Sequence, residues 1–315
     1  MLRKRKINSK NRQLKVLKIR DILIIVIAGL LAGCSSDDIT TGGFSVSDEW
    51  EIKPGDPVMF TTNVYGKVGT TRTVTYEPVG AGYTFTYFMY KEVESVSTFV
   101  AKGSTVYWPD INSTAYGFIA KTGTLDANGE FADLSADQET EAKLINEDQL
   151  LGYGAVDADV DKGIIHYRTA ANWKNDNTDL DEADKKNIRL YMQHRRAKIT
   201  IILKAGANVT SEDLASASVT IYSYPGAIAV DKPLKTTVGG DPHYTAIVEP
   251  YDYTSNGGQN IAQITLTRSG SNKTITYKPS NDPSEDKSAY NLAADNAGNA
   301  GKHLTITITL TAPTP

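Results

Sequence analysis

The chain has 315 residues, a formal net charge of −4 and a single cysteine. With one cysteine, no disulfide can form within the chain, so its stability must come from packing. Threonine is abundant, tyrosine occurs 17 times and leucine-rich helical stretches are absent, so the composition favours strands over helices.

The first 33 residues have the three parts of a secretory signal. Residues 1–20 carry nine lysines and arginines, an apolar run extends from Ile22 to Ala32, and small residues close the segment. Eleven apolar residues at about 1.5 Å per residue reach about 16 Å, roughly half of the hydrocarbon thickness of a bilayer. We therefore expect a cleaved signal peptide over residues 1–33, and no stable membrane span.

Leu31-Ala32-Gly33-Cys34 ends this segment and resembles the lipobox of bacterial lipoproteins. In a lipobox, the cysteine receives a diacylglycerol before cleavage and becomes the first residue of the mature protein. Two or three acyl chains hold a protein stably on a bilayer. We expect lipidation of Cys34. The alternatives are a chance cysteine after an ordinary signal peptide and a buried thiol.

Residues 34–43 are expected to form a flexible acidic tether. Within it, Ser35-Ser36-Asp37-Asp38 resembles the short acidic export signal of surface-exposed lipoproteins in bacteroidete bacteria. Because the signal peptide has a net charge of +8, its removal leaves 282 residues with a net charge of −12. A chain this acidic lacks the basic patch that nucleic acid requires, and its length allows two domains.

Alternation of apolar and polar residues recurs along the mature chain and is typical of half-buried strands. In Tyr83–Tyr90, the side chains of Tyr83, Phe85, Tyr87 and Met89 share one face. Few segments have helical signals. Ser135 to Asn146 is expected to form one helix, with Ser135 as N-cap and Gln138 in the capping-box position.

Two acidic segments follow. Asp157 to Gly163 resembles a calcium loop, but Lys162 and Arg168 occupy the positions where an EF-hand needs glycine and glutamate. A solvated turn and a weak Ca²⁺ site both remain open there. A short helical turn is expected over Thr178 to Lys186, where acidic residues suit a helix N-terminus.

The alternation changes parity at His194-Arg195-Arg196. Ile188, Leu190 and Met192 are even-numbered, whereas the apolar residues from Ala197 to Leu203 are odd-numbered. A strand cannot change its buried face without a bulge, a bend or a change of sheet. We therefore predict a domain crossover here, with one β-sandwich over residues 44–194 and a second over residues 195–315.

The last segments are the clearest strands. Residues 261–277 read as a hairpin around Arg268 to Asn272, and His303 to Leu310 alternates apolar residues with threonine. Short strands separated by Gly, Asn, Asp and Pro turns predict an all-β fold of two tandem antiparallel sandwiches.

The sequence contains no recognised catalytic constellation, so we expect no enzyme, no cofactor and no metal. The four histidines are scattered and are expected to be structural: His166, His194, His243 and His303. Trp108 and Trp173 could in principle stack on sugars, but core or turn positions are the favoured interpretation.

Several segments resemble the fimbrillin family of bacteroidete surface proteins, the type V pilins and their accessory subunits. The family pattern is a lipobox, a strand, a Thr-Arg pair, an aromatic strand, a Tyr-Trp-Pro turn with a strand after it, a mid-chain histidine strand and a Gly-Lys-His terminal strand. The matching segments are Cys34, Pro57–Thr62, Thr71-Arg72, Tyr83–Tyr90, Tyr107-Trp108-Pro109, Tyr116–Ala120, Leu190–Ile199 and Gly301–Leu310. Their order, together with the lipobox, carries the resemblance.

This resemblance implies two sandwiches of transthyretin-like topology that assemble by strand exchange. A surface protease would cut after Arg72, the strand from Val58 to Val64 would leave, and the strand carrying Leu304, Ile306, Ile308 and Leu310 would serve as donor. An ordinary surface arginine is the alternative for Arg72. The implied partners are other fimbrial subunits, the outer membrane through the Cys34 lipid, and a host or bacterial surface ligand.

The leading hypothesis is therefore a structural or adhesive subunit of a fimbria-like fibre, exposed on the outer membrane. The alternative is a monomeric glycan-binding surface lipoprotein with Trp108 or Trp173 as its aromatic platform. A surface hydrolase is the third hypothesis and rests only on the abundance of Asp and Glu.

Overall fold

A computed structural model describes residues 52–66, 75–78, 82–154, 164–176, 187–226, 228–268, 271–279, 287–294 and 300–312. The expected signal peptide, the tether, Cys34 and Arg72 lie outside these ranges, as do the acidic segments 157–163 and 178–186. No helix within the described ranges is long and apolar enough to cross a membrane.

A seven-stranded sheet comes first in the chain, with the strand order β2-β1-β7-β6-β5-β3-β4. Its strands are β1 (Phe60–Gly66), β2 (Thr75–Pro78), β3 (Phe85–Val93), β4 (Val96–Gly103), β5 (Tyr116–Thr122), β6 (Leu150–Gly154) and β7 (Ile188–His194). Neighbouring strands are antiparallel, with the exception of β1 and β7, which are parallel.

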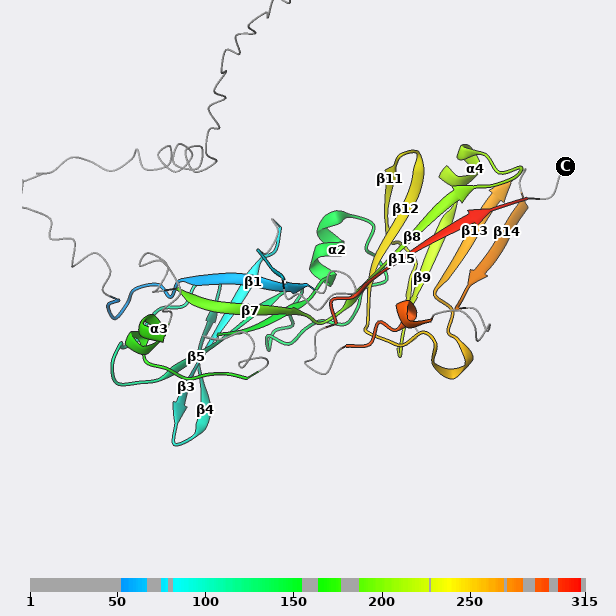
Figure 1. Ribbon diagram of the computed structural model, residues 1–315. Coiled ribbons are helices and arrows are strands. Elements are labelled where there is room, and N and C mark those ends of the chain that lie inside the picture. Colours follow the sequence, from blue (N-terminus) through cyan, green and yellow to red (C-terminus); the bar gives the residue numbers. More distant parts are fainter. Residues whose placement is uncertain are drawn as a thin grey trace, which may run out of the picture. The chain divides into compact units, whose positions relative to one another are not determined.

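Two four-stranded sheets follow, with the orders β11-β12-β8-β15 and β10-β9-β13-β14 (Figure 1). Their strands are β8 (Ala197–Ala205), β9 (Ser218–Ser223), β10 (Ile228–Val230), β11 (Leu234–Val238), β12 (Asp241–Val248), β13 (Ala262–Arg268), β14 (Ser271–Tyr277) and β15 (His303–Leu310). Only the β8–β15 pair is parallel among their ladders. The predicted hairpin and terminal strand are both present.

The buried side chains form two separate hydrophobic clusters. The first lies on the seven-stranded sheet and includes Phe118, Trp108 and Trp173. The second lies between the two four-stranded sheets, with Ile201 from one sheet and Ile264 from the other. Each cluster uses one face of its sheets, as the alternation predicts, but Phe88 of β3 and Tyr191 of β7 are also buried, on the opposite face of the seven-stranded sheet. The expected all-β class is confirmed, with two parallel strand pairs added to the antiparallel pattern.

The change of parity coincides with a change of sheet. Ile188, Leu190 and Met192 of β7 belong to the first cluster, whereas Ile199 and the other odd-numbered apolar residues of β8 belong to the second. The two strands are separated by only Arg195 and Arg196. The boundary is not a clean division, however, because Leu134 from the first half lies in the second cluster.

The helices are short. They are α2 (Glu141–Glu147), α3 (Ala170–Asp176), α4 (Ser211–Ala215) and the 3-10 turns Ser255–Gly257 and Ser288–Tyr290. The expected helix from Ser135 was wrong at its start, since Thr140 is the N-cap of α2 and its hydroxyl accepts from the Lys143 N–H. Ser135 and Gln138 instead belong to an extended segment that contacts the second half of the chain.

Candidate strand-exchange site

β1 is the strand on which a strand-exchange mechanism would act. It lies between β2 and β7, and it runs parallel to β7 from Phe60 opposite Ile188 to Tyr65 opposite Gln193. Because β1 is the only neighbour of β2 in the sheet, removing β1 would uncover one edge of β7. An uncovered strand edge is a template for pairing with another chain.

The residues just before β1 are bound to the turn around Trp108. Three backbone hydrogen bonds join them: Gly55 N–H to Trp108 O at 2.8 Å, Trp108 N–H to Asp56 O at 3.0 Å and Val58 N–H to Val106 O at 2.9 Å. Val58 is 4% exposed and belongs to the first cluster. Any departure of β1 therefore has to break these contacts as well as the ladder with β7.

The side chain of Phe60 anchors the start of β1. Its ring stacks on Tyr87 with a centroid distance of 4.1 Å and meets the edge of Phe118 at 5.5 Å. Tyr87 belongs to β3 and Phe118 to β5, which in the strand order are separated from β1 by β7 and β6. If β1 left, it would expose these aromatic rings as well as the edge of β7, and a foreign strand with an apolar residue at this register would cover both.

β15 is the proposed donor, and it lies at the edge of its own sheet. It pairs with β8 in parallel over eight residues, from His303 opposite Lys198 to Leu310 opposite Ala205. Leu304, Ile306 and Leu310 are buried in the second cluster, and Ile308 is partly buried against it. The predicted common face is correct, and in this structure it covers the chain's own core.

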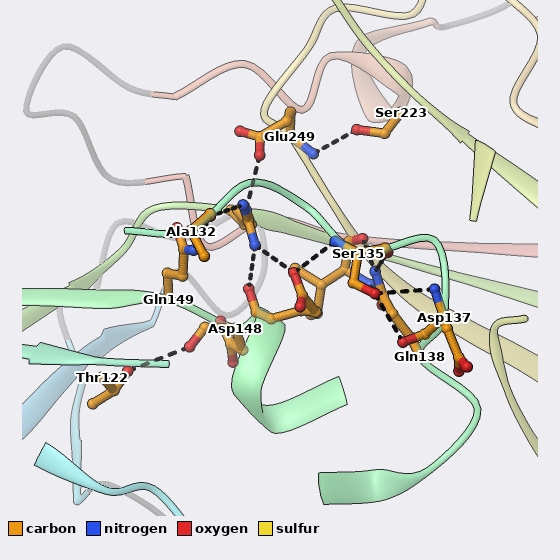
Figure 2. A network of polar contacts seen from close by, with 12 residues as sticks. Thr122, Ala132, Ser135, Asp137, Gln138, Asp148, Gln149, Ser223 and Glu249 are labelled. Atoms are coloured by element: carbon orange, nitrogen blue, oxygen red, sulfur yellow. Dashed lines mark hydrogen bonds and ion pairs between the residues drawn. The ribbon is translucent and has the colours of Figure 1, made fainter. Parts of the chain in front are cut away.

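A buried polar network joins the two halves next to the β7–β8 crossover (Figure 2). Arg196 is 3% exposed. Its Nη1 donates to Glu147 Oε2 at 2.6 Å, its Nε to Glu249 Oε1 at 2.8 Å and its Nη2 to Ala132 O at 2.9 Å. Glu147 Oε2 also accepts from the Ser135 N–H. One guanidinium thus links α2, the segment before it and the end of β12.

The segment before α2 pairs with the second half through its backbone and through one amide. Gln138 is fully buried; its Nε2 donates to Ile247 O at 3.0 Å and its Oε1 accepts from Ile247 N–H at 2.8 Å. The Gln138 N–H donates to Lys232 O at 2.8 Å. Together these bonds join the two halves through a segment that the sequence assigns to the first.

His194 ends β7 in a second polar cluster. Its Nδ1 lies 2.7 Å from Asp148 Oδ1, and the Tyr83 hydroxyl donates to Asp148 Oδ2 at 2.7 Å. Burial disfavours the charged form of Asp148, but the hydrogen bond and charge of His194, together with the Tyr83 hydroxyl, outweigh it and lower the pKa of Asp148. Burial of the Tyr83 side chain and the negative charge of Asp148 together raise the pKa of Tyr83.

The remaining candidate residues have structural surroundings. Trp108 and Trp173 are 2% and 1% exposed, so the favoured core positions are correct and neither ring can stack on a sugar. The Trp173 Nε1–H donates to Tyr116 O. His303 Nε2 lies 2.9 Å from the Thr200 hydroxyl, and burial followed by the Lys198 charge lowers its pKa.

The described residues contain no group of three or more His, Cys, Asp or Glu side chains arranged to hold a metal. The residues of the Arg196 network were not predicted from the sequence to lie together. The adjacent pair Arg195-Arg196 at the parity change was the available signal, because a charged residue at a change of buried face must find partners. Its partners Glu147 and Glu249 cannot be identified from spacing.

Comparisons with solved structures show similarity to bacteroidete surface proteins. A candidate cell adhesion protein of Bacteroides fragilis matches with a TM-score of 0.38 and 12% identity, over 82% of this chain and 95% of that one. A fimbrial protein of Bacteroides ovatus matches with a TM-score of 0.37 and 8% identity, over 84% of this chain and 52% of that one.

A fimbrial anchor protein of Porphyromonas gingivalis matches with a TM-score of 0.31 and 10% identity, over 79% of this chain and 91% of that one. No family model and no curated protein matches the sequence. Similarity of this extent assigns neither a family nor a function, so the function proposed below depends on the chain's own residues and topology.

Proposed function

We propose that this chain is a structural or adhesive subunit of a fimbria-like surface fibre, lipidated at Cys34 during transit and assembled by strand exchange. Cys34 carries the lipid, and the acidic tether after it directs the protein to the outer face of the outer membrane. The chain acts by binding other subunits and a surface ligand, and it catalyses no reaction.

One topological observation supports strand exchange best. β7 and β8 are consecutive strands on either side of the crossover, and each has a parallel neighbour. That neighbour is β1 for β7 and β15 for β8. The strand proposed to leave and the strand proposed to be donated therefore each run parallel to one strand of the crossover, although β1 also pairs with β2 and β15 lies at a sheet edge. A donated β15 could pair with β7 in the same polarity that it already has beside β8.

The proposed sequence of events starts with proteolysis. A surface protease hydrolyses the peptide bond after Arg72, which lies in the chain between β1 and β2. This cut separates β1, together with the lipidated Cys34, from the rest of the mature chain. β1 is then held only by non-covalent contacts, and the subunit loses its lipid anchor when β1 leaves. The main contacts to break are the ladders with β7 and β2, the three hydrogen bonds around Trp108 and the packing of Val58 and Phe60.

The donor must also leave its own core. β15 contributes three side chains that are at most 6% exposed: Leu304, Ile306 and Leu310. Their burial in a neighbouring subunit would restore the hydrophobic energy lost on release, and pairing with β7 would restore the backbone hydrogen bonds. Exchange would therefore form about as many contacts as β15 loses on release. The loss of β1 after proteolysis would make the process favour assembly.

An Arg-specific protease tests this function. Treatment of the purified surface protein should create a new N-terminus at Thr73 and convert the monomer into an SDS-resistant ladder. Arg72→Lys should prevent both changes, whereas Arg195→Lys, at an exposed arginine, should leave both intact. The proposal is wrong if assembled fibres contain only chains that begin at Cys34, or if chains beginning at Thr73 remain monomeric.

The glycan-binding alternative loses its two specified residues, since both tryptophans are core residues. Loss of sugar binding in Trp108→Ala or Trp173→Ala would therefore report a damaged core and could not identify a sugar site.

A further inference from the structure

The outer end of the β3–β4 hairpin is exposed on both of its faces. All residues from Glu92 to Phe99 are exposed, and these include Val93 at 46%, Val96 at 62% and Phe99 at 55%. Figure 1 shows this hairpin extending away from the rest of its sheet. Apolar side chains on a projecting hairpin contribute little to their own fold, so they are available to a partner.

β4 is also an edge strand, and the features that usually protect an edge, here Lys102 and a bulge, lie only in its second half, beyond Phe99. Short length, proline and lysine normally prevent edge-to-edge pairing. Among the described edge strands, β2 has four residues with Pro78 at its end, β10 has three residues, and β11 and β14 contain Lys235 and Lys273.

In β4, the stretch from Val96 to Ala101 carries no charge and no proline. A bulge interrupts the β3–β4 ladder between Phe99 and Ala101, so the regular part of the edge runs from Val96 to Phe99. β15 is likewise uncharged apart from His303, but its exposed face is threonine. β4 therefore combines an open edge with exposed apolar side chains.

We propose that β4 pairs with β4 of a second copy of this chain, in antiparallel orientation around a two-fold axis near Thr98. The distribution of charge selects this occupant. Glu94 lies in the turn before β4 and Lys102 lies beyond the bulge, near the end of β4. Both are exposed, and the Lys102 ammonium also donates to Ala127 O at 3.1 Å. Antiparallel pairing brings each Lys102 near the Glu94 of the other copy, so opposite charges meet at both ends of an uncharged centre.

The same arrangement satisfies the backbone and the apolar side chains. In an antiparallel strand, alternate residues direct their N–H and C=O groups away from the first neighbour. A second β4 would form hydrogen bonds with these groups. Phe99 already meets Tyr90 edge to face, with a centroid distance of 5.9 Å, so its ring is held in place for contact across the new ladder. This pairing leaves β1 and β15 in their own sheets and does not depend on cleavage at Arg72.

Disulfide trapping in the full-length chain tests the pairing, with Cys34→Ser in every variant so that the introduced thiol is the only one. Thr98→Cys at the two-fold axis should give a covalent dimer on non-reducing gels, because facing residues of an antiparallel pair are close enough for a disulfide. Thr305→Cys, on the exposed face of the edge strand β15, is the matched control and should remain monomeric. Adding Phe99→Lys to Thr98→Cys should reduce the dimer by at least about tenfold.

Three results would overturn the proposal. The first is a Thr98→Cys chain no more dimeric than the Thr305→Cys chain. The second is a dimer that forms only when the two variants are mixed, which would mean that β4 pairs with β15. The third is a Phe99→Lys chain that dimerises as before. Circular dichroism of each variant establishes that it is folded.

Discussion

Replacing Arg196 with alanine should strongly destabilise the protein. The arginine side chain is 3% exposed and its partner Glu147 is 9% exposed, with 2.6 Å between Nη1 and Oε2. Deleting one member of a buried ion pair costs about 3–5 kcal/mol, because the other charge stays buried without compensation. The contact to Glu249 adds little, since that side chain is 34% exposed and regains water.

Urea unfolding of the purified chain measures this loss. A decrease of about 3–5 kcal/mol in the free energy of unfolding should lower the midpoint by about 1 M or more, given an m-value of about 1–3 kcal/mol/M. Arg195→Ala, at the exposed neighbour, should change stability by less than about 0.5 kcal/mol. Adding Glu147→Gln to Arg196→Ala should recover part of the loss by removing the orphaned charge. An Arg196→Ala loss below about 1 kcal/mol, with an unchanged m-value, would refute this account of the network.

Three further predictions concern the anchor, the pH dependence and the departing strand. Cys34→Ser should abolish metabolic labelling with palmitate and release the protein from the outer membrane; continued labelling would contradict lipidation. The pKa of Asp148 is lowered in the folded state, so its contribution to stability is present above the unfolded pKa and is lost as the pH falls through the folded pKa, below about pH 4. Asp148→Asn should therefore be less stable at neutral pH and should lose less stability than the wild type when acidified, as measured by thermal unfolding across pH. Phe60→Ala should weaken β1 by roughly 1–3 kcal/mol and speed proteolysis between β1 and β2, whereas Met59→Ala, at a side chain 48% exposed, should not; equal proteolysis rates would mean that the stacking on Tyr87 does not hold β1.

Alternation was sufficient to predict the strands whose two faces differ most. β15 has the predicted bounds, and the parity change at His194 marks a change of sheet because a strand can bury only one face at a time. Helices were harder. The N-cap of α2 is Thr140 rather than Ser135, and the side chain of Gln138 hydrogen-bonds to Ile247, a residue more than one hundred positions away, in place of capping a helix.

The strands of the candidate site could be predicted from the sequence, but the polar contacts around them could not. A pattern along the chain can identify apolar faces such as that of β15, but it contains no information about which distant strand lies beside which. The parallel pairing of β1 with β7, and the link from Arg196 to Glu147 and Glu249, depend on that order. The lipobox pointed to Cys34 and the resemblance to fimbrillins to Arg72, and both stay predictions because they lie outside the described residues.

The two strands proposed for exchange are held by their own subunit in different ways. β15 buries Leu304, Ile306 and Leu310 and pairs along eight residues, so at about 1.5–3 kcal/mol for each buried side chain its release costs several kcal/mol of hydrophobic free energy. β1 is held by a six-residue ladder with β7 and a four-residue ladder with β2, together with the packing of Val58 and Phe60 at its start. Proteolysis would cut the covalent link of β1, whereas the covalent link of β15 stays intact. β15 should leave only when a neighbour's free β7 edge is already available, so exchange would propagate from subunit to subunit and would not start spontaneously in a pool of intact monomers.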